Sequence, residues 1–369
     1  MSSESDYSFL SDQEYSEVSY SSDYELTDTD LFEYDDIIEI RERIKTETTI
    51  RNLDRCIIYI LSDILISNHD YLACYIVSKY FDIQKALNYY PICHVAAIHE
   101  CTETLKYLIQ ERHVSPNIQD AGGQTPLHSA VMKGKVKSTE LLIELDADIN
   151  VRDNDGNTPL HVAVYYEKVE TERILLSNSV RLEIRNNKQR TPLYLAFEHF
   201  NPFIINNLIA FGAMMNVRDY HGNTPLHAMM TCDNCYKYYD YVLDYINIAL
   251  SRRIDINTKN NNKNTPLYEY IKCISRTSDF DKYESFILSV IKFFITHGAS
   301  PNTKNENGNT VLHLIPRVEY INIIKLLMCY NAKVDIKNKL NETPLSLAKR
   351  YPENNAELID YMSNNCSND

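Results

Sequence analysis

The sequence feature that most restricts the fold is a short phrase that recurs at a fixed distance. Thr-Pro-Leu, followed by His, Tyr or Ser, begins at residues 125, 158, 191, 224, 265 and 343, and Thr-Val-Leu-His begins at residue 310. Successive threonines lie 33, 33, 33, 41, 45 and 33 residues apart. A period of this size is typical of a solenoid, in which each unit buries its apolar face against its neighbours.

Each copy of the phrase predicts a turn that leads into a capped helix. Gly156 suits a tight turn, Thr158 is a good N-cap, and Pro159 fits the first helical position. Leu160 and Ala163 then continue an apolar face at helical spacing. A second apolar segment follows in each unit and ends at a residue suited to a left-handed conformation, namely Asp146, Gly212, Gly298 and Asn331. The unit is therefore predicted to be helix, loop, helix and extended turn.

These residues resemble the ankyrin repeat family, whose signature is Thr-Pro-Leu-His-x-Ala. The resemblance implies an all-α ankyrin-repeat solenoid, built from helix-turn-helix units with short β-hairpin-like turns. It also implies a non-catalytic role in protein–protein interaction. Cys93-His94-Val95-Ala96-Ala97 is similar to the signature without its Thr-Pro, and His94 lies 34 residues before His128.

Three segments are predicted. Residues 1–36 contain twelve Asp and Glu and no Lys or Arg, which predicts a disordered acidic tail. Two readings of this tail stay open, a solubilising segment and a segment that is phosphorylated or binds a partner. Residues 37–89 are predicted to form a helical N-terminal cap or degenerate repeat, and residues 90–369 an ankyrin solenoid of about eight units.

Two of these units carry insertions. The unit from Thr224 is eight residues longer than the 33-residue period, and the unit from Thr265 is twelve residues longer. The excess falls at residues 231–240 and 275–283, between the two helices. Lengthened helices or protruding loops are expected there, as possible contact elements.

Charge and cysteine content restrict the class of partner and the cellular compartment that we expect. The chain has a net charge of −14, of which the first 36 residues carry −12. The remainder is nearly neutral, so we expect no basic stripe for phosphate groups and no direct nucleic-acid partner. Nine cysteines, an odd number, and no signal peptide indicate reduced thiols in the cytoplasm, with the nucleus as an alternative. No apolar run is long enough to span a membrane.

No residue pattern predicts catalysis, a cofactor, a metal or a small-molecule substrate. The motif histidines 128, 161, 227 and 313 belong to successive units, which places them too far apart to share one zinc ion. In ankyrin repeats this histidine bonds the turn and cap backbone. Cys232 and Cys235 form a Cys-x-x-Cys pair without two further ligands at suitable spacing, and we expect ordinary thiols.

Protein binding remains, and the family resemblance implies that partners contact the turn tips and the exposed side of the first helix. At the corresponding positions stand the candidate binding residues Lys133, Tyr165, Tyr166, Arg190, His199, Tyr220 and His221. Tyr and Arg are enriched in interface hot spots. We therefore expect Tyr165, Tyr166, Arg190 and Tyr220 to contribute most.

The Tyr-, Asn- and Ile-rich composition and the overlong units resemble the ankyrin proteins of poxviruses. Many of those end in an F-box-like segment that recruits a host ubiquitin ligase. Only seven residues follow Met362, so we expect similarity to the ankyrin-only members, which act on host range or innate immune signalling. A ubiquitin-ligase adaptor and a cellular ankyrin scaffold are the alternatives. The sequence assigns no partner and no oligomeric state.

Overall fold

The computed structural model describes Ile64, Asp70 and Ala73 and then residues 92–231, 239–276 and 280–364. The predicted acidic tail and nearly all of the predicted N-terminal cap lie outside these residues. The described repeats belong to one compact unit, Ile57–Asp369.

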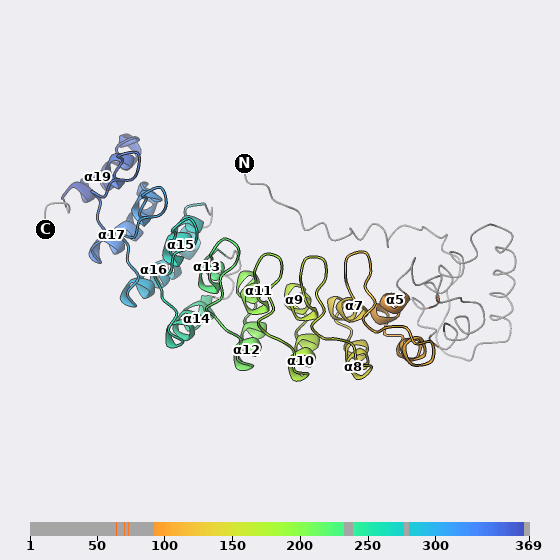
Figure 1. Ribbon diagram of the computed structural model, residues 1–369. Coiled ribbons are helices and arrows are strands. Elements are labelled where there is room, and N and C mark those ends of the chain that lie inside the picture. Colours follow the sequence, from red (N-terminus) through yellow and green to blue (C-terminus); the bar gives the residue numbers. More distant parts are fainter. Residues whose placement is uncertain are drawn as a thin grey trace, which may run out of the picture. The chain divides into compact units, whose positions relative to one another are not determined.

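Each repeat pairs an inner helix with an outer helix, and the two sets form two rows (Figure 1). The inner row consists of α5 (Ile92–Ile98), α7 (Pro126–Met132), α9 (Pro159–Tyr165), α11 (Pro192–His199), α13 (Pro225–Met230), α15 (Pro266–Ile274), the 3₁₀ turn η4 (Val311–His313) and α18 (Pro344–Ala348). The outer row consists of α6 (Thr102–Lys106) with the π-helix η2 (Tyr107–Glu111), α8 (Val136–Glu144), α10 (Val169–Ser177), α12 (Pro202–Ala210), α14 (Tyr239–Ser251), α16 (Phe280–Thr296), η5 (Val318–Tyr320) with α17 (Ile321–Cys329), and α19 (Pro352–Asn364). The described residues contain no strand. The predicted helical solenoid is confirmed.

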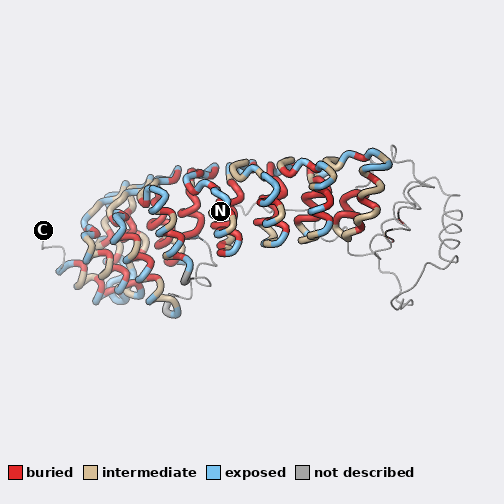
Figure 2. The backbone as a smooth tube through the Cα atoms, turned by 90° about the horizontal axis from the view of Figure 1, so that it is seen from below, coloured by how far each residue is buried: buried red, intermediate tan, exposed pale blue. Residues whose placement is uncertain are grey.

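The core runs along the solenoid, because each inner helix packs on the next inner helix and most outer helices pack on the next outer helix. Leu160 and Ala163 of α9 are fully buried, as is Leu175 of α10. Buried residues recur in every described repeat (Figure 2). None of the described helices combines the length and the apolar composition that crossing a membrane requires.

The two overlong units contain longer outer helices. Helices α8, α10, α12 and α17 have 9 residues each, whereas α14 has 13 and α16 has 17. Part of the extra length is therefore helical, in line with the first alternative, lengthened helices. Residues 232–238 and 277–279 of the insertions lie outside the described part.

The chain leaves the outer helices through the left-handed residues expected from sequence. Asp146, Asn331, Gly212 and Gly298 have φ values of 60°, 65°, 93° and 91°. The hairpins that follow are joined by backbone hydrogen bonds from one repeat to the next. The N–H of Asn187 donates to Asp155 O at 2.9 Å, and the N–H of Tyr220 donates to Lys188 O at 3.0 Å.

Candidate functional site

The site is built on a cap that repeats along the inner row of helices. In α9, the imidazole Nδ1 of His161 accepts the N–H of Thr158 at 3.1 Å and lies 2.8 Å from its hydroxyl. The Nε2 of His161 lies 3.1 Å from the carbonyl oxygen of Arg190 in the next repeat. One buried side chain therefore closes its own helix cap and ties its repeat to the next.

Tyrosine replaces this histidine in two repeats and reaches further. The hydroxyl of Tyr194 donates to Asp219 Oδ2 at 2.9 Å, and Asn305 Nδ2 donates to the hydroxyl of Tyr268 at 3.0 Å. Asp219 is itself the first residue of its hairpin, and its Oδ1 accepts the N–H of His221 at 2.9 Å. The tyrosines therefore connect the inner helices to the side chains that shape the next turn.

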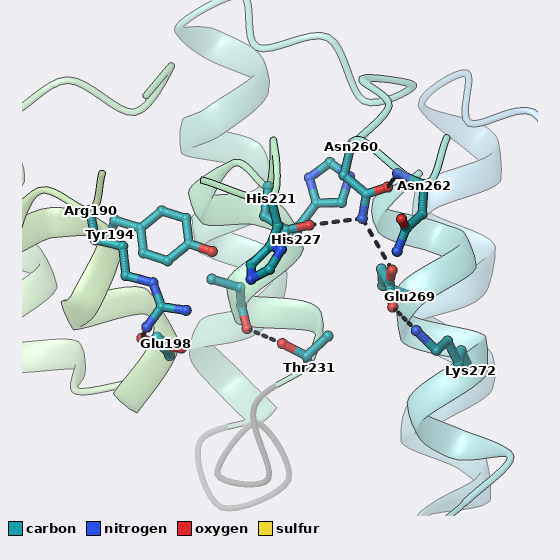
Figure 3. A pocket seen from close by; sticks show the side chains of 12 residues that line it. Arg190, Tyr194, Glu198, His221, His227, Thr231, Asn260, Asn262, Glu269 and Lys272 are labelled. Carbon is teal, nitrogen blue, oxygen red and sulfur yellow. Dashed lines mark hydrogen bonds and ion pairs between the residues drawn. The ribbon is translucent and has the colours of Figure 1, made fainter. Parts of the chain in front are cut away.

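Beside Tyr194, α11, α13 and α15 and their hairpins enclose a hollow of about 260 Å³ (Figure 3). Its walls are mainly polar and carry charges of both signs. The residues that line it are Arg190, Tyr194, Glu198, His221, Asn223, His227, Ala228, Thr231, Asn260, Asn262, Glu269 and Lys272.

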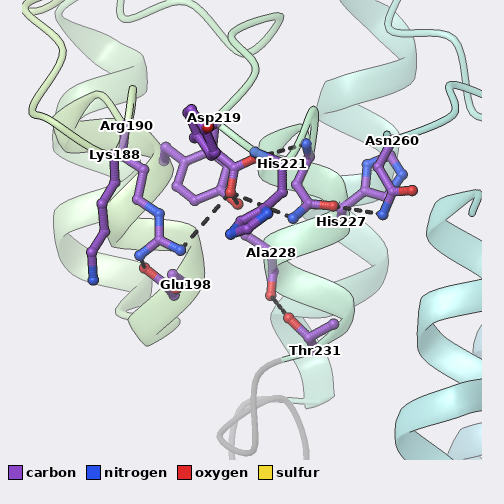
Figure 4. Close-up of polar contacts among 12 residues, drawn as sticks. Lys188, Arg190, Glu198, Asp219, His221, His227, Ala228, Thr231 and Asn260 are labelled. Atoms are coloured by element: carbon purple, nitrogen blue, oxygen red, sulfur yellow. Dashed lines mark hydrogen bonds and ion pairs between the residues drawn. The ribbon is translucent and has the colours of Figure 1, made fainter. Parts of the chain in front are cut away.

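Arg190 forms one wall of this hollow. Its guanidinium lies 2.7 Å from Glu198 Oε2 and 3.8 Å from Asp219 Oδ2, and its central carbon lies 5.3 Å from the centre of the Tyr194 ring (Figure 4). The side chain is 17% exposed. Arg190 is therefore held within the solenoid by a network that its position in the sequence did not indicate.

Glu269 forms the opposite wall. Its carboxylate accepts hydrogen bonds from Asn264 at 2.6 Å, from Asn260 at 3.2 Å and from Lys272 at 3.0 Å. Burial raises the pKa of Glu269, but these donors together outweigh burial and lower the pKa overall. The carboxylate is therefore ionised and bonded at neutral pH.

A second hollow, of about 310 Å³, follows along the solenoid and shares Asn262 and Lys272 with the first. Amide side chains dominate its lining, which is completed by Asn264, Tyr268, Ser275, Arg276, Asn305, Glu306, Asn307, Asn309 and Leu314. The two hollows lie on adjoining repeats and share two lining residues, and we call them together the polar groove.

The structure brings the predicted binding residues together in two groups. Tyr165 lies edge-to-face with Tyr166 at 5.1 Å between ring centres and with His199 of the next repeat at 5.0 Å. Tyr220 is 73% exposed at a hairpin tip and lies edge-to-face with His221 at 5.7 Å.

Two further candidates, Arg190 and Lys133, occupy different settings. Arg190 and His221 both line the first hollow. Lys133 is exposed at the end of α7, where its charge and that of Lys135 lower the pKa of His99 after the larger effect of burial.

Sequence reasoning missed the groove residues Tyr194, Asp219, Glu269 and Lys272. One signal was available, because Tyr stands in place of the motif His at positions 194 and 268. A longer side chain at that buried position has to end on a different partner. The ion pairs of Glu198 and Lys272 follow from tertiary packing and left no trace in the spacing.

The motif histidines are structural. Burial lowers the pKa of His128 and His161 to about 4, which makes both imidazoles neutral at pH 7. Both nitrogens of each ring are in hydrogen bonds, as described for His161. Within the described residues, no group of three or more His, Cys, Asp or Glu is placed to hold a metal ion. Cys232 and Cys235 lie outside those residues.

The solenoid carries a line of exposed cations that its net charge did not indicate. The residue before the first residue of each hairpin is an exposed cation in six consecutive repeats: Arg152, Arg185, Arg218, Lys259, Lys304 and Lys337. Net charge concealed this pattern, because acidic residues elsewhere in each unit cancel the total. Comparing the same position from unit to unit reveals it.

The repeated caps, paired helices and hydrogen-bonded hairpins define a helical-repeat fold of the ankyrin type. A family model described as ankyrin repeats (3 copies) matches residues 93–186 and 284–369. These two segments therefore contain ankyrin repeats.

A solved structure supports the same fold. The chain is similar to the ankyrin repeat domain of Bcl-3, described as a unique member of the IkappaB protein family, with a TM-score of 0.51 and 24% identity. The match covers 65% of this chain and 99% of the Bcl-3 chain. No curated protein matches the sequence. The ankyrin fold indicates a scaffold for protein–protein interaction.

Proposed function

We propose that this chain is a non-catalytic scaffold that binds its protein partner along the polar groove and the adjoining aromatic residues. We further propose that it is a viral protein that binds a host protein in the host cytoplasm and alters host range or innate immune signalling. The viral setting rests on the poxvirus-like composition and overlong repeats. The groove assignment rests on the geometry below.

The observation that supports the binding site best is that the two hollows lie side by side. They share Asn262 and Lys272 and so offer one partner contacts on adjoining repeats. The lining offers donors and acceptors together with the ion pairs Arg190–Glu198 and Lys272–Glu269. A polar, partly charged groove suits a protein segment that presents its own polar groups.

The aromatic residues beside the groove supply contact area. Tyr220 is largely exposed, and Tyr165, Tyr166 and His199 form edge-to-face contacts that fix their rings before a partner arrives. Rigid aromatic side chains lose little entropy on binding, which is why they dominate interface energetics. Arg190 contributes by shaping the groove through Glu198 and Asp219.

The test uses a purified partner and single alanine variants. Tyr165→Ala and Tyr220→Ala each weaken binding by about tenfold or more, on the scale of interface anchors, and leave the melting temperature within about two degrees. Phe203→Ala, at an exposed residue of outer helix α12, is the matched aromatic control and binds as wild type does. Wild-type affinity in both tyrosine variants would remove the adjoining aromatic residues from the proposed binding site.

The same preparations separate the scaffold from the ligase-adaptor alternative. A scaffold purifies from host cells without cullin-ligase components. Stoichiometric recovery of such a component with the full-length chain would favour the adaptor instead. The remaining alternative is a cellular ankyrin scaffold. A partner from the same organism as this chain would favour that alternative, and the groove assignment would be unchanged.

A further inference from the structure

A second surface lies apart from the polar groove. We call Arg152, Arg185, Arg218, Lys259, Lys304 and Lys337 the cation column, since each occupies the same position of its repeat. All six side chains are exposed. We propose that the cation column binds an extended acidic polypeptide segment, independently of the partner in the groove.

The hairpin ladder aligns the column. Backbone bonds between consecutive hairpins, such as Tyr220 N–H to Lys188 O and Asn261 N–H to His221 O, hold equivalent positions in register. The residue after each cation is the first hairpin residue, and Asp219 there is buried and points to Tyr194. Successive side chains of an extended chain point to opposite sides. None of the six cations lines either hollow of the groove.

The charges of the column are not required by the fold. Arg218 and Lys304 donate to the carbonyl oxygens of Lys259 and Lys337, one repeat further on, each at 3.1 Å. Gln119 occupies the equivalent position one repeat before Arg152, and its neutral amide donates to Arg152 O, also at 3.1 Å. An uncharged side chain thus makes the same contact between repeats, so this contact does not require a charged donor.

The charges are also not neutralised. In the described part of the chain none of the six forms an ion pair, whereas Arg190 and Lys272 in the groove and Arg317 and Lys325 elsewhere do. The acceptors of Arg152 are the neutral oxygens of Gly156 and Asn187. The column is therefore a line of exposed positive charge, several members of which are fixed by hydrogen bonds.

The spacing favours a polypeptide over a nucleic acid. Stacked helices lie roughly 8–10 Å apart, so the column offers one cation about every 10 Å. Duplex DNA carries a charge about every 1.7 Å, far denser than the column. The column contains no aromatic residue for base stacking, and Glu183 and Asp335 stand two residues before Arg185 and Lys337.

An extended polypeptide fits this spacing. Its residues rise about 3.3 Å each, so a carboxylate at every third position recurs about every 10 Å. Such a segment presents one carboxylate to each cation and leaves neutral residues opposite the interspersed acidic side chains.

The test measures fluorescence anisotropy with the full chain at about 50 mM salt, below the concentration at which exposed charges are strongly screened. The probe is a labelled 21-residue peptide of the repeat Glu-Ser-Gly. The combined variant Arg185→Gln, Lys259→Gln and Lys337→Gln removes only cations whose side chains make no hydrogen bond among the described residues. Its Kd rises by about four- to a hundred-fold, as three exposed charge pairs at a few tenths to 1 kcal/mol each would give.

Matched controls isolate the column. Lys137→Gln, Lys292→Gln and Lys349→Gln together change the net charge equally at exposed positions outside it, and this variant binds the peptide within twofold of wild type. Equal weakening in both triple variants would overturn the proposal. So would tighter, column-dependent binding of oligo-dT, which would identify a nucleic-acid surface. Tyr220→Ala binds the Glu-Ser-Gly peptide normally, so failure of the groove assignment is distinguishable.

Discussion

Acid should destabilise the solenoid through its buried caps, and His161 provides the sharpest test. The folded state lowers the pKa of His161 to about 4 by burying a neutral ring, whereas an unfolded histidine titrates near 6.5. The neutral imidazole is bonded to Thr158 and to the carbonyl of Arg190. Its contribution to stability is therefore complete above pH 6.5 and is lost as the pH falls from 6.5 toward 4.

The size of the loss follows from proton linkage. A drop from pH 7 to pH 5 protonates the unfolded histidine and leaves the folded one neutral, which costs on the order of 2 kcal/mol for this single residue. His128 has the same shift and the same sign, so the pair contributes about twice that amount. Burial raises the pKa of Glu172 to about 7. This shift stabilises the folded state at low pH, and the stabilisation decreases as the pH rises from 4.5 toward 7. Glu172 therefore opposes the effect of the two histidines.

The variant that isolates His161 is His161→Tyr, since the chain itself uses Tyr at positions 194 and 268 of the same motif. Urea unfolding of both proteins at pH 7 and pH 5 gives the pH dependence of the unfolding free energy. The variant loses about 2 kcal/mol less than wild type on going to pH 5, because Tyr does not titrate there. Contributions from Glu172 and other carboxylates cancel in the difference.

His161→Gln repeats the comparison with a smaller side chain, in case tyrosine is not accommodated at this position. An identical pH dependence in wild type and in both variants would refute the assignment of His161 as a buried neutral cap. The absolute stability at pH 7 is not the readout, because either substitution changes packing as well.

Three further predictions concern single residues. Glu172→Gln raises the unfolding free energy by about 1–3 kcal/mol at pH 8 and not at pH 4.5, measured by urea titration, since it removes a buried charge with one unbonded oxygen. Asp219→Ala lowers the unfolding free energy by about 2 kcal/mol or more in the same titration, through loss of its hydrogen bonds to Tyr194 and to its own turn. Gly156→Ala lowers it similarly, by about 1–3 kcal/mol, because φ is 78° and the added Cβ would lie 2.9 Å from Asn187 N.

The repeating part of the fold was predictable because its determinants are local. Thr158, Pro159 and Leu160 specify a cap and a helix within a few residues, and the 33-residue period specifies the stacking. The left-handed positions Asp146 and Asn331 were predictable for the same reason. Each choice depends on backbone chemistry that the residue type determines.

The groove was less predictable because it depends on contacts between repeats. Arg190 stands at a turn and was expected to face a partner, yet packing places Glu198 and Asp219 against it. Nothing in the spacing of Glu269 and Lys272 indicates that Asn260 and Asn264 complete their network. The cation column was visible in the sequence only when equivalent positions of successive repeats were compared.

The central claim, that a protein partner lies in the polar groove, is tested most directly by site-specific photo-crosslinking. A photoreactive amino acid replaces Tyr220, which contacts the groove residue His221, in one protein, and Lys292, an exposed residue of outer helix α16, in another. Our account predicts that the purified partner crosslinks at position 220, that Tyr165→Ala in the same chain reduces this product about tenfold, and that position 292 yields none. Crosslinking of the partner at position 292 and not at position 220 would contradict it.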